Sequence, residues 1–183
     1  MDAVVPSAGF ANRTLCWSCF VAIHPDLARS KVRKEHLVLS ELERRCSDVF
    51  EQCGRTTWDC PVEGGCSLKR PDLALDFGSH VVVVEVDEAQ HEAAPCWDED
   101  SRLAVIAADF QKPIAVIRLR VDAPEPCFRR KRLGNGEPVW EAKEGSFALI
   151  MARAEAALRE LAQRKPCGEE DEAVTQVWLT AGV

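Results

Sequence analysis

The fold is most constrained by two apolar strands, expected over residues 70–77 and 80–88, with Gly78–Ser79 between them. The first stretch reads RPDLALDF and the second HVVVVEVDE. Glycine at the first central position of a two-residue connection is typical of a tight hairpin turn. With the turn at this place, the pairing register puts Asp72 opposite Glu85. The segment therefore predicts an antiparallel strand pair of defined register.

Side chains alternate between the two faces of a strand, so this pair has an apolar face and an acidic face. The apolar face holds Leu73, Leu75, Val82, Val84 and Val86, and the other face holds Asp72, Asp76, Glu85 and Asp87. Neighbouring carboxylates repel one another unless a cation lies among them, and a divalent metal is the simplest such cation. Carboxylate oxygens suit Mg²⁺ or Mn²⁺, which activate water and stabilise charge on a scissile phosphate.

His91 follows Asp87 by four residues and is a candidate general base. The alternative interpretation is that the acidic face is only the solvated side of a half-buried hairpin and that this histidine is incidental. Asp76 is either a carboxylate that supports the site or an exposed side chain.

The remaining periodicities predict an α/β fold with the order helix, three strands, helix, strand, followed by a helix and a short strand. The helices are expected over residues 31–50, 98–110 and 146–164, the further strands over 56–62, 113–121 and 175–179, and a loop over 122–138. We expect an N-terminal cysteine-containing segment (1–30), a core (31–121) and a C-terminal loop, helix and strand packed on it (122–183).

Composition limits the classes of function. The 183 residues are 46% hydrophobic, enough for one sizeable core, and the formal net charge of −7 argues against a protein that coats nucleic acid. Basic clusters at 29–34, 118–120 and 129–132 nevertheless allow a basic face. No stretch predicts a signal peptide or a membrane span, so we expect a soluble intracellular protein, nuclear or cytoplasmic, with no membrane partner.

The order of a helix bearing Glu35, then Arg70-Pro71-Asp72, then Glu85-Val86-Asp87, then a helix and a strand, resembles the PD-(D/E)XK restriction-endonuclease-like superfamily. The string EVDEAQH over residues 85–91, followed by Glu99 and Arg102, is similar to the branch of very-short-patch repair and EDxHD homing endonucleases. It is more similar still to uncharacterised proteins of large DNA viruses, oomycetes and algae. The resemblance covers about residues 14–121.

This resemblance implies an αβββαβ core with a mixed sheet and a metal-dependent DNA endonuclease acting on double-stranded DNA, as a homodimer or in a larger protein complex. Asp72 and Glu85 would bind Mg²⁺ or Mn²⁺, and His91 would be an accessory catalytic group. Glu35 would correspond to the helical glutamate of the family, with an ordinary exposed helix glutamate as the alternative.

Asp87 occupies the position at which the superfamily usually has a lysine that positions the water and neutralises charge. Activity then requires His91, or Lys69 and Arg70, to substitute for that lysine. We expect Arg102 to be an ion-pair partner of the acidic cluster rather than a catalytic residue. The competing function is an inactive nuclease-like subunit that binds other proteins, or a zinc-stabilised interaction protein.

Nine cysteines in a chain of this kind favour metal binding or buried thiols over disulfides. Cys16 and Cys19 have the spacing of half a zinc site. Spacing alone does not identify the other two zinc ligands, for which the candidates are Cys66, Cys96, His24, His36, Cys46, Cys53 and Cys60. The resemblance favours Cys66 and Cys96. The alternative, small buried hydrophobes, suits Cys46, Cys127 and Cys167.

Overall fold

The structure is a computed structural model that describes residues 33–88, 96–122, 124–132, 134, 138–164 and 174–182, together with two short paired strands. Those two strands are β1 (Val5–Pro6) and β2 (Thr14–Leu15), which pair antiparallel. For β1, β2, residues 96–100 and residue 138, only the backbone is described.

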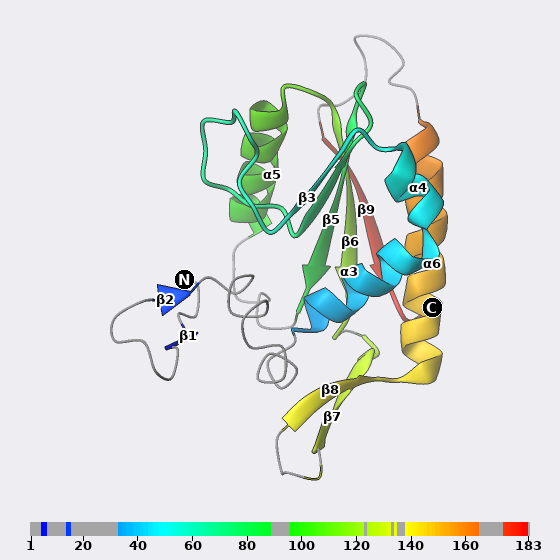
Figure 1. Cartoon of the computed structure of the whole chain (residues 1–183). Coiled ribbons are helices and arrows are strands. Elements are labelled where there is room, and N and C mark those ends of the chain that lie inside the picture. The colour runs from blue at the N-terminus through cyan, green and yellow to red at the C-terminus, as the bar shows by residue number, and fades with distance from the viewer. Residues whose placement is uncertain are drawn as a thin grey trace.

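The chain folds into a mixed α/β structure (Figure 1). The helices are α3 (Lys34–Arg45), α4 (Ser47–Gln52), α5 (Cys96–Phe110) and α6 (Glu144–Gln163). The further strands are β3 (Arg55–Trp58), β4 (Leu73–Asp76), β5 (Val81–Asp87), β6 (Ile114–Arg120), β7 (Phe128–Arg132), β8 (Pro138–Ala142) and β9 (Val174–Thr180).

Five strands form one mixed sheet in the order β3-β4-β5-β6-β9. β4 runs antiparallel to both of its neighbours, whereas β5, β6 and β9 are parallel. The expected hairpin register is confirmed, because Leu73 pairs with Val84 and the Phe77 N–H donates to the His80 carbonyl at 3.0 Å. Gly78 has a φ of 84°, which a glycine adopts without strain and which the turn requires.

Helices cover both faces of this sheet, giving three layers. α3 and α6 pack on one face, against Leu73, Leu75, Val82, Val84 and Ile117, and α5 packs on the other, against Ala74, Val81, Val83 and Val116. Burial on both faces explains why β5 and β6 are apolar almost without interruption. The interpretation of a solvated polar face is therefore wrong: most of the acidic side of the hairpin is core beneath α5.

Three elements differ from their expected bounds by more than two residues. The helix expected over 31–50 is interrupted at Cys46, whose φ and ψ of −114° and 30° are not helical. The strand expected over 56–62 ends at Trp58, where Asp59 takes a positive φ of 37°. The strand that precedes the tight turn contains only four residues, so Asp72 lies just before β4.

The loop expected over 122–138 was wrong, because β7 and β8 form an antiparallel hairpin there. Its first strand reads FRRKR, in which four successive exposed cations leave no alternation of apolar and polar residues by which a strand is usually detected. Within the described residues, no helix is long and apolar enough to cross a membrane.

Candidate functional site

Four carboxylates lie at one edge of the five-stranded sheet. β4 runs antiparallel to β3 and β5, so its start lies at the edge where these two strands end. Asp72 precedes β4, Asp59 follows β3, and Glu85 lies near the end of β5; Glu35 is in the first turn of α3. We call Glu35, Asp59, Asp72 and Glu85 the acidic edge. The carboxyl ends of parallel strands are where open α/β sheets usually bind ligands.

Glu85 is the most deeply buried of these residues, with 5% of its surface exposed. Arg102 of α5 donates from Nη1 to Oε2 at 3.0 Å and from Nη2 to Oε1 at 3.2 Å. The same Nη2 donates to the Arg70 carbonyl at 2.7 Å. Arg102 is thus the ion-pair partner that the sequence predicted, and it compensates the burial of the Glu85 charge.

Asp72 is partly buried, and its Oδ2 accepts the Val86 N–H at 2.8 Å. Burial raises the pKa of Asp72 to about 7, and the nearby Glu35 charge adds to this effect. Burial also raises the pKa of Glu85 to about 8, with repulsion from Asp72 as the second cause. The Asp72 charge thus disfavours ionisation of Glu85, as neighbouring carboxylates do.

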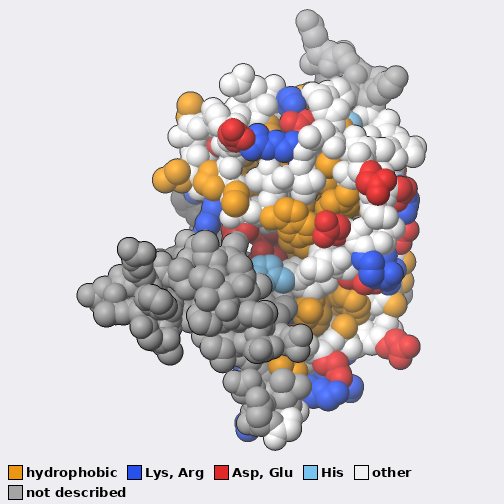
Figure 2. All heavy atoms as spheres, in the orientation of Figure 1, with side chains coloured by type: hydrophobic (Ala, Val, Ile, Leu, Met, Phe, Trp, Pro, Cys, Tyr) orange, Lys and Arg blue, Asp and Glu red, His pale blue; other side chains and the backbone are white. Residues whose placement is uncertain are grey.

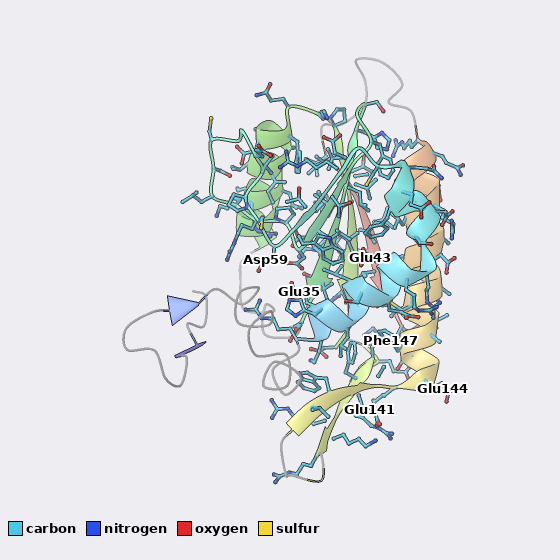
Figure 3. All side chains as sticks on the ribbon, viewed as in Figure 1. Glu35, Glu43, Asp59, Glu141, Glu144 and Phe147 are labelled. Atoms are coloured by element: carbon cyan, nitrogen blue, oxygen red, sulfur yellow. The ribbon has the colours of Figure 1, made fainter. Side chains whose placement is uncertain are left out.

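Glu35 belongs to the same group. Its side chain is 12% exposed, which excludes the ordinary exposed helix glutamate. Burial raises its pKa, the Arg33 guanidinium 3.6 Å away opposes that shift, and Asp59 adds to it. Figure 3 shows Glu35 and Asp59 close together beside the sheet edge, on α3 and at the end of β3. The helix and the hairpin thus bring Glu35, Asp72 and Glu85 close together.

Asp87 forms an ion pair with Arg118 of the next strand, β6. Arg118 on β6 donates from Nε to Oδ2 at 2.9 Å and from Nη2 to Oδ1. The Arg118 guanidinium also lies 4.7 Å from the Trp178 ring centroid. An Asp87 carboxylate that is paired with Arg118 cannot supply the positive charge that the lysine of the superfamily provides at this position. Of the two candidate substitutes, Lys69 is exposed and Arg70 lies at the acidic edge, with Nε 3.6 Å from Asp59 Oδ1.

Asp76 is separate from this group. It lies at the opposite end of β4, and both of its oxygens accept hydrogen bonds from Lys112 Nζ at 2.7 Å. It is neither an exposed side chain nor a neighbour of Asp72, and it forms its own ion pair.

Sequence reasoning missed Asp59 and Lys34. The Asp59 N–H donates to the Asp72 carbonyl at 3.1 Å, which continues the β3–β4 register beyond the paired residues. Lys34 is buried and binds both oxygens of Asp122 at 2.8 and 2.7 Å, with Glu88 Oε2 at 3.8 Å. Asp59 lay inside the strand expected over 56–62, so no sequence pattern singled it out. Only the pairing register of β3 with β4 brings it beside Asp72.

A divalent metal ion fits the donor chemistry of Asp72 and Glu85, because hard cations such as Mg²⁺ are often held by one or two carboxylates with water. Among the residues that the structure describes, no group of three or more His, Cys, Asp and Glu side chains is placed to hold a metal ion. His91 lies outside the described residues, so its position relative to the two carboxylates stays a prediction.

Most of the expected zinc site also lies outside the described part of the chain. Cys16 and Cys19 are not described, and for Cys96 only the backbone is. Cys66 is exposed, and its N–H donates to Asp109 Oδ1 at 2.8 Å. Cys46 and Cys127 are buried thiols whose pKa burial raises to about 11, as expected for small core residues. The zinc site therefore stays a prediction.

A scan against models of protein families, a search of curated proteins and a search of solved structures each found no match to this chain.

Proposed function

We propose that this protein is a divalent-metal-dependent endonuclease that hydrolyses phosphodiester bonds of double-stranded DNA at the acidic edge. The observation that carries the proposal is the convergence of Asp72, Glu85 and Glu35 from three separate elements. Buried carboxylates that raise one another's pKa are costly for folding, and such groups concentrate at functional sites.

The arrangement of elements supports the same proposal. The superfamily that the sequence resembles has the core order helix, three strands, helix, strand, and the chain has this order from α3 to β6, with the additional helix α4 after α3. In the strand order β3-β4-β5-β6, Asp72 directly precedes β4 and lies beside β5, the antiparallel neighbour that carries Glu85. β9 extends this sheet beyond the region that carries the resemblance.

In this proposal Asp72 and Glu85 hold Mg²⁺ or Mn²⁺, and Glu35 lies beside them. The ion, when bound, supplies an activated water and stabilises charge on the phosphate. Arg102 holds Glu85 in place and balances its charge. Arg70, beside Asp59, provides a cation at the acidic edge and so compensates for the lysine that Asp87 replaces.

A second candidate function rests on the two arginine pairs. Arg102 engages both oxygens of Glu85, and Arg118 engages both oxygens of Asp87. Carboxylates paired in this way do not need a metal for charge balance, as they would in an inactive nuclease-like subunit that binds other proteins. This alternative predicts a protein that cuts no nucleic acid with any divalent ion.

Plasmid nicking distinguishes the two functions. The wild-type protein is incubated with supercoiled plasmid and Mn²⁺ or Mg²⁺, and we expect nicked circles that EDTA prevents. Asp72→Asn should lower the rate at least about a hundredfold, because it removes a charged metal ligand while keeping the side-chain shape.

Asp76→Asn is the matched control, since it changes the same residue type on the same face at the opposite end of β4. It should keep the wild-type rate within about threefold. Nicking that survives in Asp72→Asn would show a contaminating nuclease or another site. No nicking by the wild type with either metal would reject the endonuclease in favour of the subunit.

A further inference from the structure

The β7–β8 hairpin lies outside the five-stranded sheet, at the end where β5 and β6 finish (Figure 1). Its base is attached to the core: Phe128 is buried, its ring centroid is 5.3 Å from that of Phe147, and the Lys143 N–H donates to the Cys127 carbonyl at 2.8 Å. Beyond Phe128 every residue of β7 is exposed. The hairpin is thus an anchored ribbon with an exposed surface.

The exposed surface is basic. Residues 128–142 hold four basic side chains, Arg129, Arg130, Lys131 and Arg132, against two acidic ones, Glu137 and Glu141. Lys and Arg side chains are visible at the lower end of the molecule in Figure 2. In a chain with net charge −7, a local excess of positive charge on a protruding ribbon requires an explanation.

The strand register divides these cations between two faces. Arg129 and Lys131 lie on the face of Glu141, which accepts from Arg129 Nε at 2.6 Å and from Lys131 Nζ at 2.6 Å. Arg130 and Arg132 lie on the other face, with Trp140. The Arg130 guanidinium is 5.0 Å from the Trp140 ring centroid. The face of Arg130 therefore combines cations with an aromatic ring.

This face contacts the start of α3. The Trp140 ring that contacts Arg130 also contacts Lys34, whose Nζ is 4.3 Å from the ring centroid. Lys34 directly precedes Glu35 in the first turn of α3. A polyanion lying along Arg132 and Arg130 would thus approach the first turn of α3, the turn that bears Glu35.

We propose that the β7–β8 hairpin is the element that binds duplex DNA and positions its backbone at the acidic edge. The proposal rests on the endonuclease function proposed above. A two-stranded ribbon is one of the shapes that the major groove of B-DNA admits, and arginine is well suited to phosphate oxygens. Arg130 and Arg132 contact the phosphates, and Trp140 holds Arg130 in place.

The test is binding of a fluorescent duplex in EDTA, which prevents cleavage, over a series of salt concentrations. We expect Arg130→Gln with Arg132→Gln to weaken binding about tenfold or more and to lower the slope of log affinity against log salt by about two. The matched control is Arg44→Gln with Arg55→Gln, which removes the same charge from exposed side chains paired with Glu41 and Glu63. The control should stay within about threefold of wild type.

The double variant Arg130→Lys with Arg132→Lys keeps the charges and should restore the salt slope, which separates a lost phosphate contact from a misfolded hairpin. Equal binding by the Arg130/Arg132 glutamine variant and its control would overturn the proposal. So would a wild type that binds no duplex at low salt, or one that prefers single-stranded RNA.

Asp76→Asn, at the opposite end of β4, should bind the duplex as the wild type does, because it leaves both the hairpin and the acidic edge intact. Binding that depends on Arg130 and Arg132 in a protein that cuts no DNA would support the hairpin as the binding element while rejecting the endonuclease. The cleavage assay and the binding assay can therefore reject the endonuclease function and the DNA-binding hairpin independently of each other.

Discussion

At the scale of residues, Asp72 and Glu85 keep their protons to a higher pH in the folded chain than in the unfolded one. Burial is the main cause for both, and the folded pKa values of about 7 and about 8 exceed the usual values near 4. The folded state therefore binds more protons across this interval, and its stability decreases as the pH rises through it.

We therefore expect the free energy of unfolding, measured by urea denaturation in EDTA, to fall by roughly 2–4 kcal/mol between about pH 5 and about pH 8. Asp72→Asn should flatten this dependence, since asparagine does not titrate and no longer repels Glu85. Asp76→Asn should not, because Lys112 keeps the pKa of Asp76 low although burial alone would raise it. A wild type whose stability rises over this interval would contradict the raised pKa values.

Arg102 gives a second prediction at this scale. Arg102→Met should destabilise the fold by about 2–4 kcal/mol at about pH 8, because Glu85 then stays buried without its cation. The loss should be smaller at about pH 5, where Glu85 takes up a proton. Arg44→Met, which breaks an exposed pair with Glu41, should cost less than about 1 kcal/mol. Equal stability of Arg102→Met and wild type at the higher pH would show that this pair does not support Glu85.

At the scale of elements, α6 provides much of one layer of the core. Its residues Ile150, Met151, Ala154 and Leu158 pack in the same cluster as α3 and the apolar face of the sheet. The buried ring of His80, beside the hairpin turn, bonds through Nε2 with the Leu161 carbonyl at 2.8 Å. The C-terminal helix is therefore part of the core that holds the β4–β5 hairpin in place.

Leu158→Ala should lower the free energy of unfolding by about 2–5 kcal/mol, because it leaves a cavity where the side chain is fully buried. Leu149→Ala on the same helix is the matched control, and its side chain is 40% exposed. The control should change stability by less than about 1 kcal/mol. Similar free energies of unfolding for the two variants, measured by urea denaturation, would show that α6 does not pack as described.

The two hairpins differ in how well their sequences predict them. β4 and β5 are short apolar runs on either side of a glycine turn, so both the strands and their register follow from local rules. In β7 the cations face solvent on both sides of the ribbon, and the only buried side chain is Phe128. Buried and exposed side chains do not alternate along β7, so its sequence carries no strand pattern.

At the scale of the whole molecule, the sequence predicted the α/β class, the order of elements from α3 to β6, and the pairing that brings Asp72 beside Glu85. These depend on the spacing of apolar residues and on one turn, which are local properties. It also predicted the Arg102 partner, since the chemistry of a buried carboxylate requires a cation.

Only the tertiary structure decided which side chains complete the acidic edge. Asp59 reaches Asp72 through a register set across a connection from 59 to 72, and Arg118 reaches Asp87 because β6 pairs parallel with β5 through the α5 crossover. The same packing places Lys34 of α3 against Asp122, Glu88 and the Trp140 ring of the basic hairpin. Local periodicity determines which segments become helices and strands, but contacts between distant segments depend on how their buried faces fit together.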